Sequence, residues 1–176
     1  MHIVLFEPEI PQNTGNVART CAATGASLDL IKPLGFSLSD KYLKRAGLDY
    51  WHLLDLHVFK SFEDLLAERP NAAFYFTSTK AKRKYTDVRY QKDDHLVFGP
   101  ETRGLPESLL RIAHDRTIRI PMKAEARSLN LSNAAAIVLY EALRQTGFDD
   151  LMDEGQLTGR ADAVAPWMRM IGDNNE

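Results

Sequence analysis

The sequence predicts an α/β fold, a mostly parallel sheet flanked by helices. Three observations along its 176 residues point to this class. Short apolar, β-branched or aromatic runs recur as expected for strands, helical segments lie between them, and the loops after the runs are rich in Gly, Pro and small polar residues. Because strands that alternate with helices form parallel sheets, these loops should meet at one edge of the sheet.

The first half of the chain supplies two strands and three helices. An Asn-rich loop leads from the strand His2–Phe6 into a helix over Val17–Thr24. The strand Leu28–Ile31 follows, and then a helix over Ser39–Ala46 that begins with polar capping residues. The helix Ser61–Glu68 starts with a Ser cap and carries acidic residues in its first turn, where they complement the helix dipole.

The second half continues the alternation. Strands are predicted over Ala72–Thr77, His95–Phe98 and Thr117–Ile120 from their aromatic and β-branched content. Between the last two, Pro106–Ala113 is predicted to be a helix with Pro at its first position, where the missing N–H costs nothing.

The last helix, Leu131–Gln145, is closed by Gly147, which tolerates the left-handed conformation common after a helix. Apolar residues occupy two neighbouring stripes, and a helix that is apolar on two faces is buried on two sides. In a chain of this size we expect one side to cover the sheet and the other to contact a second copy of the chain. The stripes hold Leu131, Ala135, Val138, Leu139 and Ala142, and beside them Ile137, Tyr140 and Leu143.

Charge and composition divide the chain near residue 147. Residues 149–176 carry seven acidic side chains against two Arg, whereas the part before them carries 20 basic against 17 acidic side chains. We therefore expect one domain over residues 1–147 and an acidic, weakly ordered tail over residues 148–176, with a short amphipathic piece near Trp167. A single Cys excludes an intramolecular disulfide and is typical of cytoplasmic proteins, and no apolar run reaches the roughly 18 residues of a membrane span.

Several familiar ligand sites do not fit the loops. The segment GPETRG (99–104) has the glycine spacing of a P-loop, but Leu105 and Pro106 replace the residues that hold phosphate and Mg²⁺. No dinucleotide-binding glycine pattern follows a strand, and the five His residues are scattered, so no metal site is expected. Cys21 is expected in the core. The remaining glycines, small polar residues, one Glu and a few Arg suit an adenine-sized ligand held by main-chain hydrogen bonds, with Arg for phosphate.

Three segments of the chain resemble the motifs of the SPOUT RNA methyltransferases. They are NTGNVART (13–20), FGPETRGLP (98–106) and IPMKAEARSLNLSNAAAIVLYEA (120–142). Their order and spacing are similar to the smallest members, and most of all to the tRNA 2′-O-methyltransferases that act on a wobble cytidine or uridine. The resemblance implies a deep trefoil knot in the C-terminal part of the sheet, S-adenosylmethionine as cofactor without a metal, and a homodimer through the first and last helices.

The same resemblance implies roles for individual residues. Arg19 would bind phosphate and orient the acceptor 2′-hydroxyl, because Arg keeps its proton in proteins and is a poor base. The implied cofactor contacts are Thr77, Gly99, Gly104, Ile120, Ser128 and Leu129. The implied catalytic residues are Arg19, Glu101, Asn130 and Ser128, and the implied RNA contacts are Arg19, Asn13, Lys82, Arg83 and Arg127.

Simpler alternatives remain for each role. Arg19 could be a surface residue, Glu101 a loop acid and Asn130 only a helix cap, and the basic run KAKRK (80–84) could be a solvated loop. For the whole protein, the alternatives are methylation of ribosomal RNA or of another tRNA position, and a non-catalytic RNA-binding factor on the same scaffold. The intact set of Arg19, Glu101 and Asn130 favours an enzyme over the non-catalytic factor. The lack of a separate RNA-binding domain favours a small substrate, and we expect a cytoplasmic enzyme that acts on the anticodon stem-loop of a tRNA.

Overall fold

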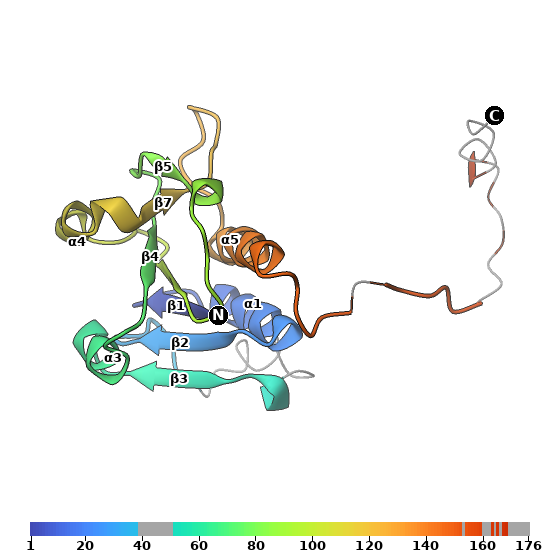
Figure 1. Ribbon diagram of the computed structural model, residues 1–176, viewed down its shortest axis with the longest axis horizontal. Helices are drawn as coiled ribbons and strands as arrows, with labels where there is room; N and C mark the ends of the chain where they lie inside the picture. Colours follow the sequence, from blue (N-terminus) through green and yellow to red (C-terminus); the bar gives the residue numbers. More distant parts are fainter. Residues whose placement is uncertain (39–50, 153, 160–162, 164, 166, 169–176) are drawn as a thin grey trace.

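The computed structural model of the chain describes residues 1–38, 51–152, 154–159, 163, 165 and 167–168 (Figure 1). The helix predicted over Ser39–Ala46 lies outside these residues. The described residues up to the end of the last helix form a layered α/β body. The described residues of the tail extend away from it, and Met152 and Leu157 are 94% and 99% exposed. The domain boundary near residue 147 stays a prediction.

The described residues form a seven-stranded sheet in the order β3-β2-β1-β6-β4-β7-β5. Each pairing between neighbouring strands is parallel, so the predicted parallel sheet is confirmed. The strands are β1 (His2–Phe6), β2 (Ser27–Ile31), β3 (Leu56–Phe59), β4 (Phe74–Thr77), β5 (Arg83–Lys84), β6 (His95–Phe98) and β7 (Thr117–Arg119).

Two of these strands were not predicted. Strand β3 has four residues and is interrupted by His57, so its apolar character is weak; it forms because it pairs with β2. Strand β5 consists of two exposed basic residues beside β7. In both cases the neighbouring strand, rather than local composition, decides the conformation.

Four α-helices are described: α1 (Pro11–Thr24), α3 (Phe62–Glu68), α4 (Glu107–Ile112) and α5 (Leu131–Gln145). Short 3₁₀ turns also occur at η1 (Trp51–Leu53), η2 (Tyr85–Asp87) and η3 (His114–Arg116).

The ends of the helices correct some predictions and confirm others. Helix α1 begins six residues earlier than predicted, because Pro11 opens it and Asn13 and Gly15 are buried against the body. Pro106 is the N-cap of α4 and not its first helical residue. Gly147 follows α5 with φ +89°, as its predicted closing role requires.

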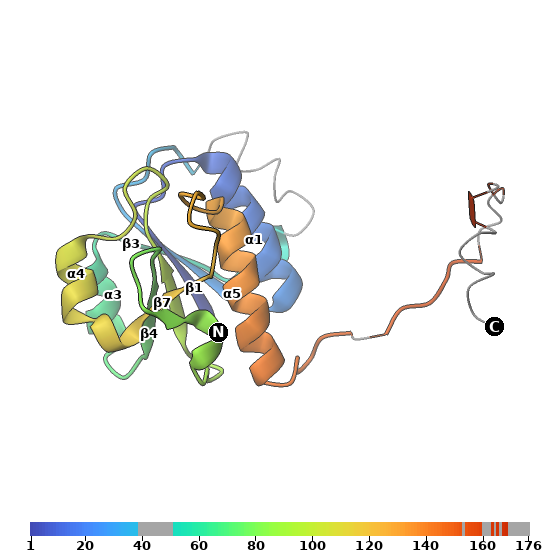
Figure 2. The same cartoon turned by 90° about the horizontal axis from the view of Figure 1, so that it is seen from above.

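Helices cover both faces of the sheet: α1 and α5 lie on one side and α3 and α4 on the other (Figure 2). Because side chains alternate along a strand, β1 sends Ile3 and Leu5 into the α1–α5 layer and Val4 into the α3–α4 layer. The predicted inner stripe of α5 is confirmed as buried: Leu131, Ala135, Val138, Leu139 and Ala142.

Two residues of the second stripe of α5 lie on the surface, while the third, Leu143, packs against the core. Ile137 is 37% and Tyr140 48% exposed, so nothing within the described residues covers them fully. The trefoil knot implied by the resemblance stays a prediction. Among the helices of the described residues, none combines the length and apolar character needed to cross a bilayer.

Candidate functional site

A cavity of about 560 Å³ lies at the carboxyl ends of β1, β4, β6 and β7. Its walls come from the segments that follow these four strands, which confirms the expectation that the loops meet at one edge. The lining includes Ile10 and Asn13 after β1, residues 77–80 after β4, residues 99–105 after β6, and Ile120, Met122 and residues 127–131 between β7 and α5.

All six residues expected to contact the cofactor line this cavity. Thr77 ends β4, Gly99 follows β6 directly, and Ile120 follows β7 directly. The other three are Gly104, Ser128 and Leu129. Residues far apart in the sequence are thus brought to one wall because parallel strands end at the same edge.

Two glycines shape the loop after β6 for different reasons. A Cβ atom on Gly99 would lie 2.4 Å from the Leu105 nitrogen and 2.5 Å from the Gly104 carbonyl carbon, so the loop closes on itself only without a side chain there. Gly104 has open space around it but adopts φ +68°, a left-handed conformation that other residues rarely adopt.

The cavity presents polar groups that suit a nucleotide-like ligand. The Thr77 hydroxyl is buried in its wall and has no hydrogen-bond partner among the described residues. Since buried polar groups are normally paired, this hydroxyl is available to a ligand. The glycine-lined loop leaves main-chain groups accessible, and Ile120, Met122 and Leu129 supply apolar surface. These features fit S-adenosylmethionine, which combines an adenine ring with polar sugar and amino-acid groups.

Glu101 holds the segment after β1 against the loop after β6. Its Oε2 accepts a hydrogen bond from the Glu9 main-chain nitrogen at 2.9 Å. Its Oε1 accepts one from the Ile10 nitrogen at 3.3 Å and one from Asn13 Nδ2 at 3.0 Å. The carboxylate is thus engaged by three donors of this chain, so Glu101 positions the site and is not a free general base.

Asn130 extends the same network to α5. Its Nδ2 donates to Asn13 Oδ1 at 2.9 Å, so Asn13 bridges Glu101 and Asn130. Its Oδ1 accepts from the Ser132 nitrogen and hydroxyl at 2.9 and 2.7 Å and from the Asn133 nitrogen at 3.4 Å. Asn130 is therefore the N-cap of α5, as one interpretation of the sequence expected, and it also lines the cavity, whereas its catalytic role stays a prediction.

Two further contacts in this network were not predicted. The Thr102 nitrogen and hydroxyl donate to the Glu9 carboxylate at 3.1 and 2.9 Å. Arg103 pairs with Glu7, so it joins the loop after β6 to the segment after β1. One signal in the sequence could have indicated these contacts: Glu7 and Glu9 flank Pro8 in the loop after the first strand. Carboxylates form strong hydrogen bonds with Arg, so they favour pairing with a loop that carries one.

Arg19 does not line the cavity. It lies on the exposed side of α1, six residues and therefore about 9 Å along the helix axis from Asn13. Arg127, by contrast, lines the cavity and is exposed there. The structure of one chain thus brings together Glu101, Asn130, Ser128 and Arg127 but not Arg19.

A second cavity, of about 830 Å³, lies beside the first, and Lys80 lines both. Lys80 Nζ lies 2.6 Å from Glu107 Oε1, and this contact lowers the pKa of Glu107. The basic residues of this cavity, which we call the basic groove, are Lys80, Lys82, Arg83, Arg111 and His114. An excess of basic side chains next to the cofactor cavity fits a polyanion.

Arg83 is already engaged by the protein. Its Nη1 donates to the Asp115 carbonyl oxygen at 3.1 Å and its Nη2 to the Asp87 carbonyl oxygen at 2.8 Å. It therefore joins two segments of the groove wall, a structural role that the sequence did not reveal. Lys82 lies beside it and is exposed. Contact of either residue with RNA stays a prediction.

A glycine-lined cavity at the carboxyl edge of a parallel sheet, next to a basic groove, defines an α/β enzyme with a nucleotide-type cofactor site. The chain belongs to the SpoU rRNA Methylase family, whose model matches residues 1–140. It is therefore a methyltransferase, as the motifs implied.

Curated relatives match nearly their whole length. The tRNA (cytidine(34)-2'-O)-methyltransferase of Yersinia pestis is 52% identical over 155 residues, which cover 84% of this chain and 95% of the relative. The protein of the same name from Methylovorus glucosotrophus is 49% identical over 147 residues, covering 83% and 96%.

Solved structures agree with the fold. One, described as "Structural insights into the 2-OH methylation of C/U34 on tRNA", is 49% identical with a TM-score of 0.78 and covers 82% of this chain and 95% of that one. The SpoU methyltransferase AviRb from Streptomyces viridochromogenes, in complex with the cofactor AdoMet, is 27% identical with a TM-score of 0.73 and covers 83% and 57%.

Proposed function

We propose that this chain transfers a methyl group from S-adenosylmethionine to the ribose 2′-oxygen of the wobble nucleotide, C or U, in the anticodon loop of a tRNA. The observation that carries the proposal is the single cavity in which the six implied cofactor residues meet the linked pair Glu101 and Asn130. The identity of about half of the sequence to enzymes named for cytidine 34 of tRNA supports the substrate.

The cofactor would lie between the loops after β4, β6 and β7. Main-chain groups around Gly99 and Gly104 and the unpaired Thr77 hydroxyl would bind its polar parts, and Ile120 and Leu129 would cover its ring. When bound, S-adenosylmethionine supplies a methyl group that its sulfonium already makes electrophilic. The residues of the chain need to align the acceptor oxygen about 3 Å from that methyl group, and none of these tasks requires a metal ion.

The acceptor would enter from the side of Arg127 and the basic groove. Arg127 and Lys82 are exposed cations that suit phosphate contacts on either side of the acceptor nucleotide. Ser128 lines the cavity beside Arg127 and would hydrogen-bond the ribose, and Asn13, whose amide already binds Glu101 and Asn130, would add its second N–H. As the methyl group moves from the sulfonium sulfur to the 2′-oxygen and leaves a neutral thioether, the 2′-hydroxyl proton would pass to a phosphate oxygen or a water molecule, since the Glu101 carboxylate is already occupied by three donors.

A homodimer through α1 and α5 would complete the site. The exposed stripe of α5 with Ile137 and Tyr140 offers apolar surface for a second copy, and α1 packs beside α5. Arg19 would then lie at or near the interface and could reach an acceptor phosphate that one chain alone leaves out of range. We place the enzyme in the cytoplasm because tRNA is its substrate.

The test uses tRNA that differs in one atom. Radiolabelled methyl incorporation is measured into a tRNA with C or U at position 34, into the same tRNA with a 2′-deoxyribose at that position, and into one with the 2′-deoxyribose at a neighbouring nucleotide. We expect incorporation into the first and third but not the second. Incorporation into all three would place the methyl group elsewhere, and incorporation into a ribosomal RNA fragment alone would show that the substrate is ribosomal RNA.

A further inference from the structure

Four neighbouring strands bring ionisable side chains together at the opposite end of the sheet. The parallel register pairs His57 of β3 with Asp29 of β2, and His2 of β1 with His95 of β6. These side chains share the face that α3 and α4 cover, toward the amino ends of the strands. No metal site was expected because the His residues are scattered along the sequence, yet the fold brings three of them to one carboxylate.

The two oxygens of the Asp29 carboxylate have different surroundings. Asp29 is fully buried. Its Oδ1 lies 3.1 Å from His57 Nδ1 and 3.5 Å from Arg69 Nη2. Its Oδ2 lies 3.2 Å from His2 Nδ1 and 3.9 Å from His95 Nε2, but makes no hydrogen bond with sound geometry among the described residues.

His95 repeats this pattern. It is 2% exposed, and its Nε2, which lies 3.9 Å from Asp29 Oδ2, has only a long contact of 3.4 Å to Arg69 Nη1 among the described residues. Buried polar atoms are rarely left unpaired, because an unmade hydrogen bond in the interior is costly. An unpaired carboxylate oxygen beside a weakly paired imidazole nitrogen offers two ligand atoms to a further partner, and the negative charge of the carboxylate favours a cation.

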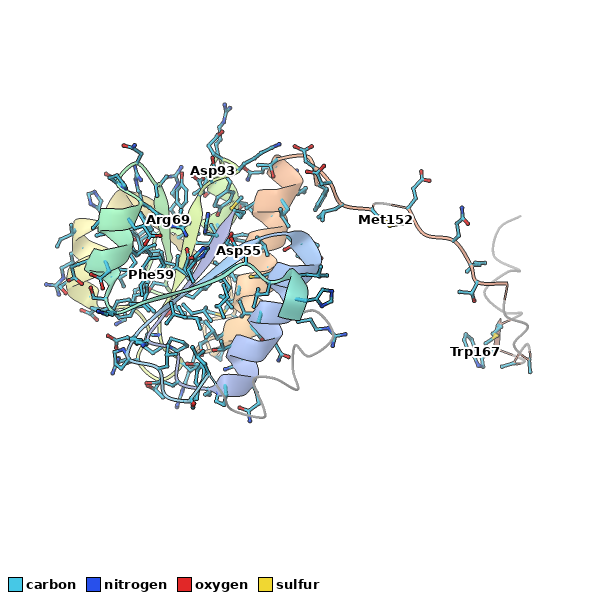
Figure 3. All side chains as sticks on the ribbon, turned by 90° about the horizontal axis from the view of Figure 1, so that it is seen from below. Asp55, Phe59, Arg69, Asp93, Met152 and Trp167 are labelled. Carbon is cyan, nitrogen blue, oxygen red and sulfur yellow. The ribbon has the colours of Figure 1, made fainter. Side chains whose placement is uncertain are left out.

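Arg69 now supplies positive charge at this point through contacts of unequal quality. It follows α3 and points to the sheet near Phe59 (Figure 3). Its Nη1 lies 2.8 and 2.9 Å from both ring nitrogens of His2, and one N–H cannot donate in the ring plane to both. Its contacts to His95 and Asp29 are long, at 3.4 and 3.5 Å. With 18% of its side chain exposed, Arg69 has a route to solvent.

We propose that His2, Asp29 and His95 bind a divalent transition-metal ion of the zinc type, and that Arg69 turns to solvent when the ion enters. One ligand atom from each of the three lies within 4.8 Å of the others. Bonds of about 2.0–2.1 Å in a tetrahedral site put ligand atoms about 3.3–3.4 Å apart, and the distances of 3.2 and 3.9 Å to Asp29 Oδ2 bracket that separation. A water molecule would take the fourth position.

The surrounding groups suit this site and define the movement it needs. His57 contacts the other oxygen of Asp29 and orients the carboxylate, as outer partners of metal ligands do. The rings of His2 and His95 are stacked 4.2 Å apart, so one ring must turn about its Cβ–Cγ bond for both to face one ion. The ion would join β1, β2 and β6 and take no part in methyl transfer.

The test uses the full chain without a purification tag, washed with a chelator and then titrated with Co²⁺ or Zn²⁺. We expect Co²⁺ to give the visible absorption of a four-coordinate ion. Zn²⁺ at about 100 times its Kd should raise Tm by about 5–10 °C. Arg69→Gln should tighten binding at least about 10-fold, because it removes a competing positive charge. His95→Gln should abolish both signals, and the matched control His114→Gln, at an exposed His, should change neither.

Three results would overturn the proposal. Wild-type protein without Co²⁺ absorption or a Zn²⁺ shift would show that no ion binds. Binding by the Arg69→Gln variant alone would make Arg69 the permanent counter-ion of Asp29. Binding that survives His95→Gln in a variant with an unchanged circular dichroism spectrum would place the ion elsewhere. Because Arg69→Gln is expected to gain binding, a folding defect cannot imitate its result.

Discussion

The two ends of the sheet use polar side chains in opposite ways. At the carboxyl end, Glu101 and Asn130 lie in loops, and their polar atoms are paired with main-chain groups and with Asn13. At the amino end, Asp29 and His95 lie within strands, and each keeps a buried atom without a partner among the described residues. Loops can adjust until their donors are paired, whereas the register of a parallel sheet fixes where strand side chains lie.

Because of this difference, we expect one end of the sheet to determine ligand binding and the other to determine the stability of the fold. The carboxyl end is an open cavity whose shape depends on a few loop contacts, so changes there should affect the ligand first. The amino end is closed and buried, so changes there should affect the free energy of unfolding and leave the cavity intact. The following variants, from the largest expected effect to the smallest, can break or sharpen this contrast.

Asp29→Asn should cause the largest loss of stability. It removes the charge that faces Arg69 and three His rings, and the loss of one partner of a buried pair costs about 3–5 kcal/mol. Denaturant unfolding measures the loss, and calorimetry below the new Tm should find S-adenosylmethionine affinity within a few-fold of wild type. Asp55→Asn, at a 61% exposed carboxylate nearby, is the control and should change little. A variant that is stable but binds no cofactor would remove the contrast between the two ends.

Glu101→Gln should reduce both stability and turnover. The amide that replaces one carboxylate oxygen is itself a donor and faces the donors Glu9 N or Asn13 Nδ2. Hydrogen bonds to a charged acceptor are worth about 1.5–3 kcal/mol, and we expect a loss of that size together with a drop in methyl incorporation of about 100-fold. Glu107→Gln in the basic groove is the matched control, and it should leave stability unchanged. Equal turnover in the two variants would contradict the positioning role of Glu101.

Gly99→Ala and Gly104→Ala should differ although both glycines line one cavity. The Gly99 methyl group would lie 2.4 Å from a main-chain nitrogen, so the loop must move, and overpacking of this kind costs about 1–3 kcal/mol. Gly104→Ala meets no atom and carries only the strain of its positive φ, about 1–2 kcal/mol. Calorimetry should therefore show the larger loss of cofactor affinity for Gly99→Ala. The reverse order would show that the loop opens freely.

Asn130→Ala and Asn130→Asp should separate the two contacts of Asn130, the N-cap of α5 and the hydrogen bond to Asn13. Loss of an N-cap costs about 1 kcal/mol, so Asn130→Ala should lower the free energy of unfolding of the protein by that amount. Asp keeps an oxygen for the Ser132 nitrogen but cannot donate to Asn13, so Asn130→Asp should recover the stability and not the methyl transfer. If Asn130→Asp is fully active, the link to Asn13 has no role in the reaction.

Much of the fold was predictable, because uninterrupted apolar runs and a long periodic helix carry their own signal. Strands β1 and β6 and helix α5 match the prediction to the residue. The start of α1 did not, since Asn and Gly are poor helix formers and only burial against the body makes them helical. Strand β5 was not predicted because its two exposed basic residues show neither the apolar alternation nor the β-branched content typical of a strand.

The sequence predicted which residues line the candidate site but not which contacts each of them makes. The motifs placed all six cofactor residues at the cavity. They could not show that Glu101 is held by three donors or that Arg83 is tied to two carbonyl oxygens, because both facts depend on segments that only the folded chain brings together. The position of Arg19 away from the cavity was equally invisible, because it depends on where α1 begins and which of its faces is exposed.

The bond between Asn13 and Asn130 joins residues 117 positions apart. On a ribosome, a growing chain that stops before residue 130 has the glycine loop but lacks the segment that fixes it, and closing so long a loop is slow as well as entropically costly. The cavity therefore becomes competent only when almost the whole domain has emerged. Truncated or stalled products would lack the affinity for methyl donor that a finished chain has, so the ability to bind the donor marks a completed molecule.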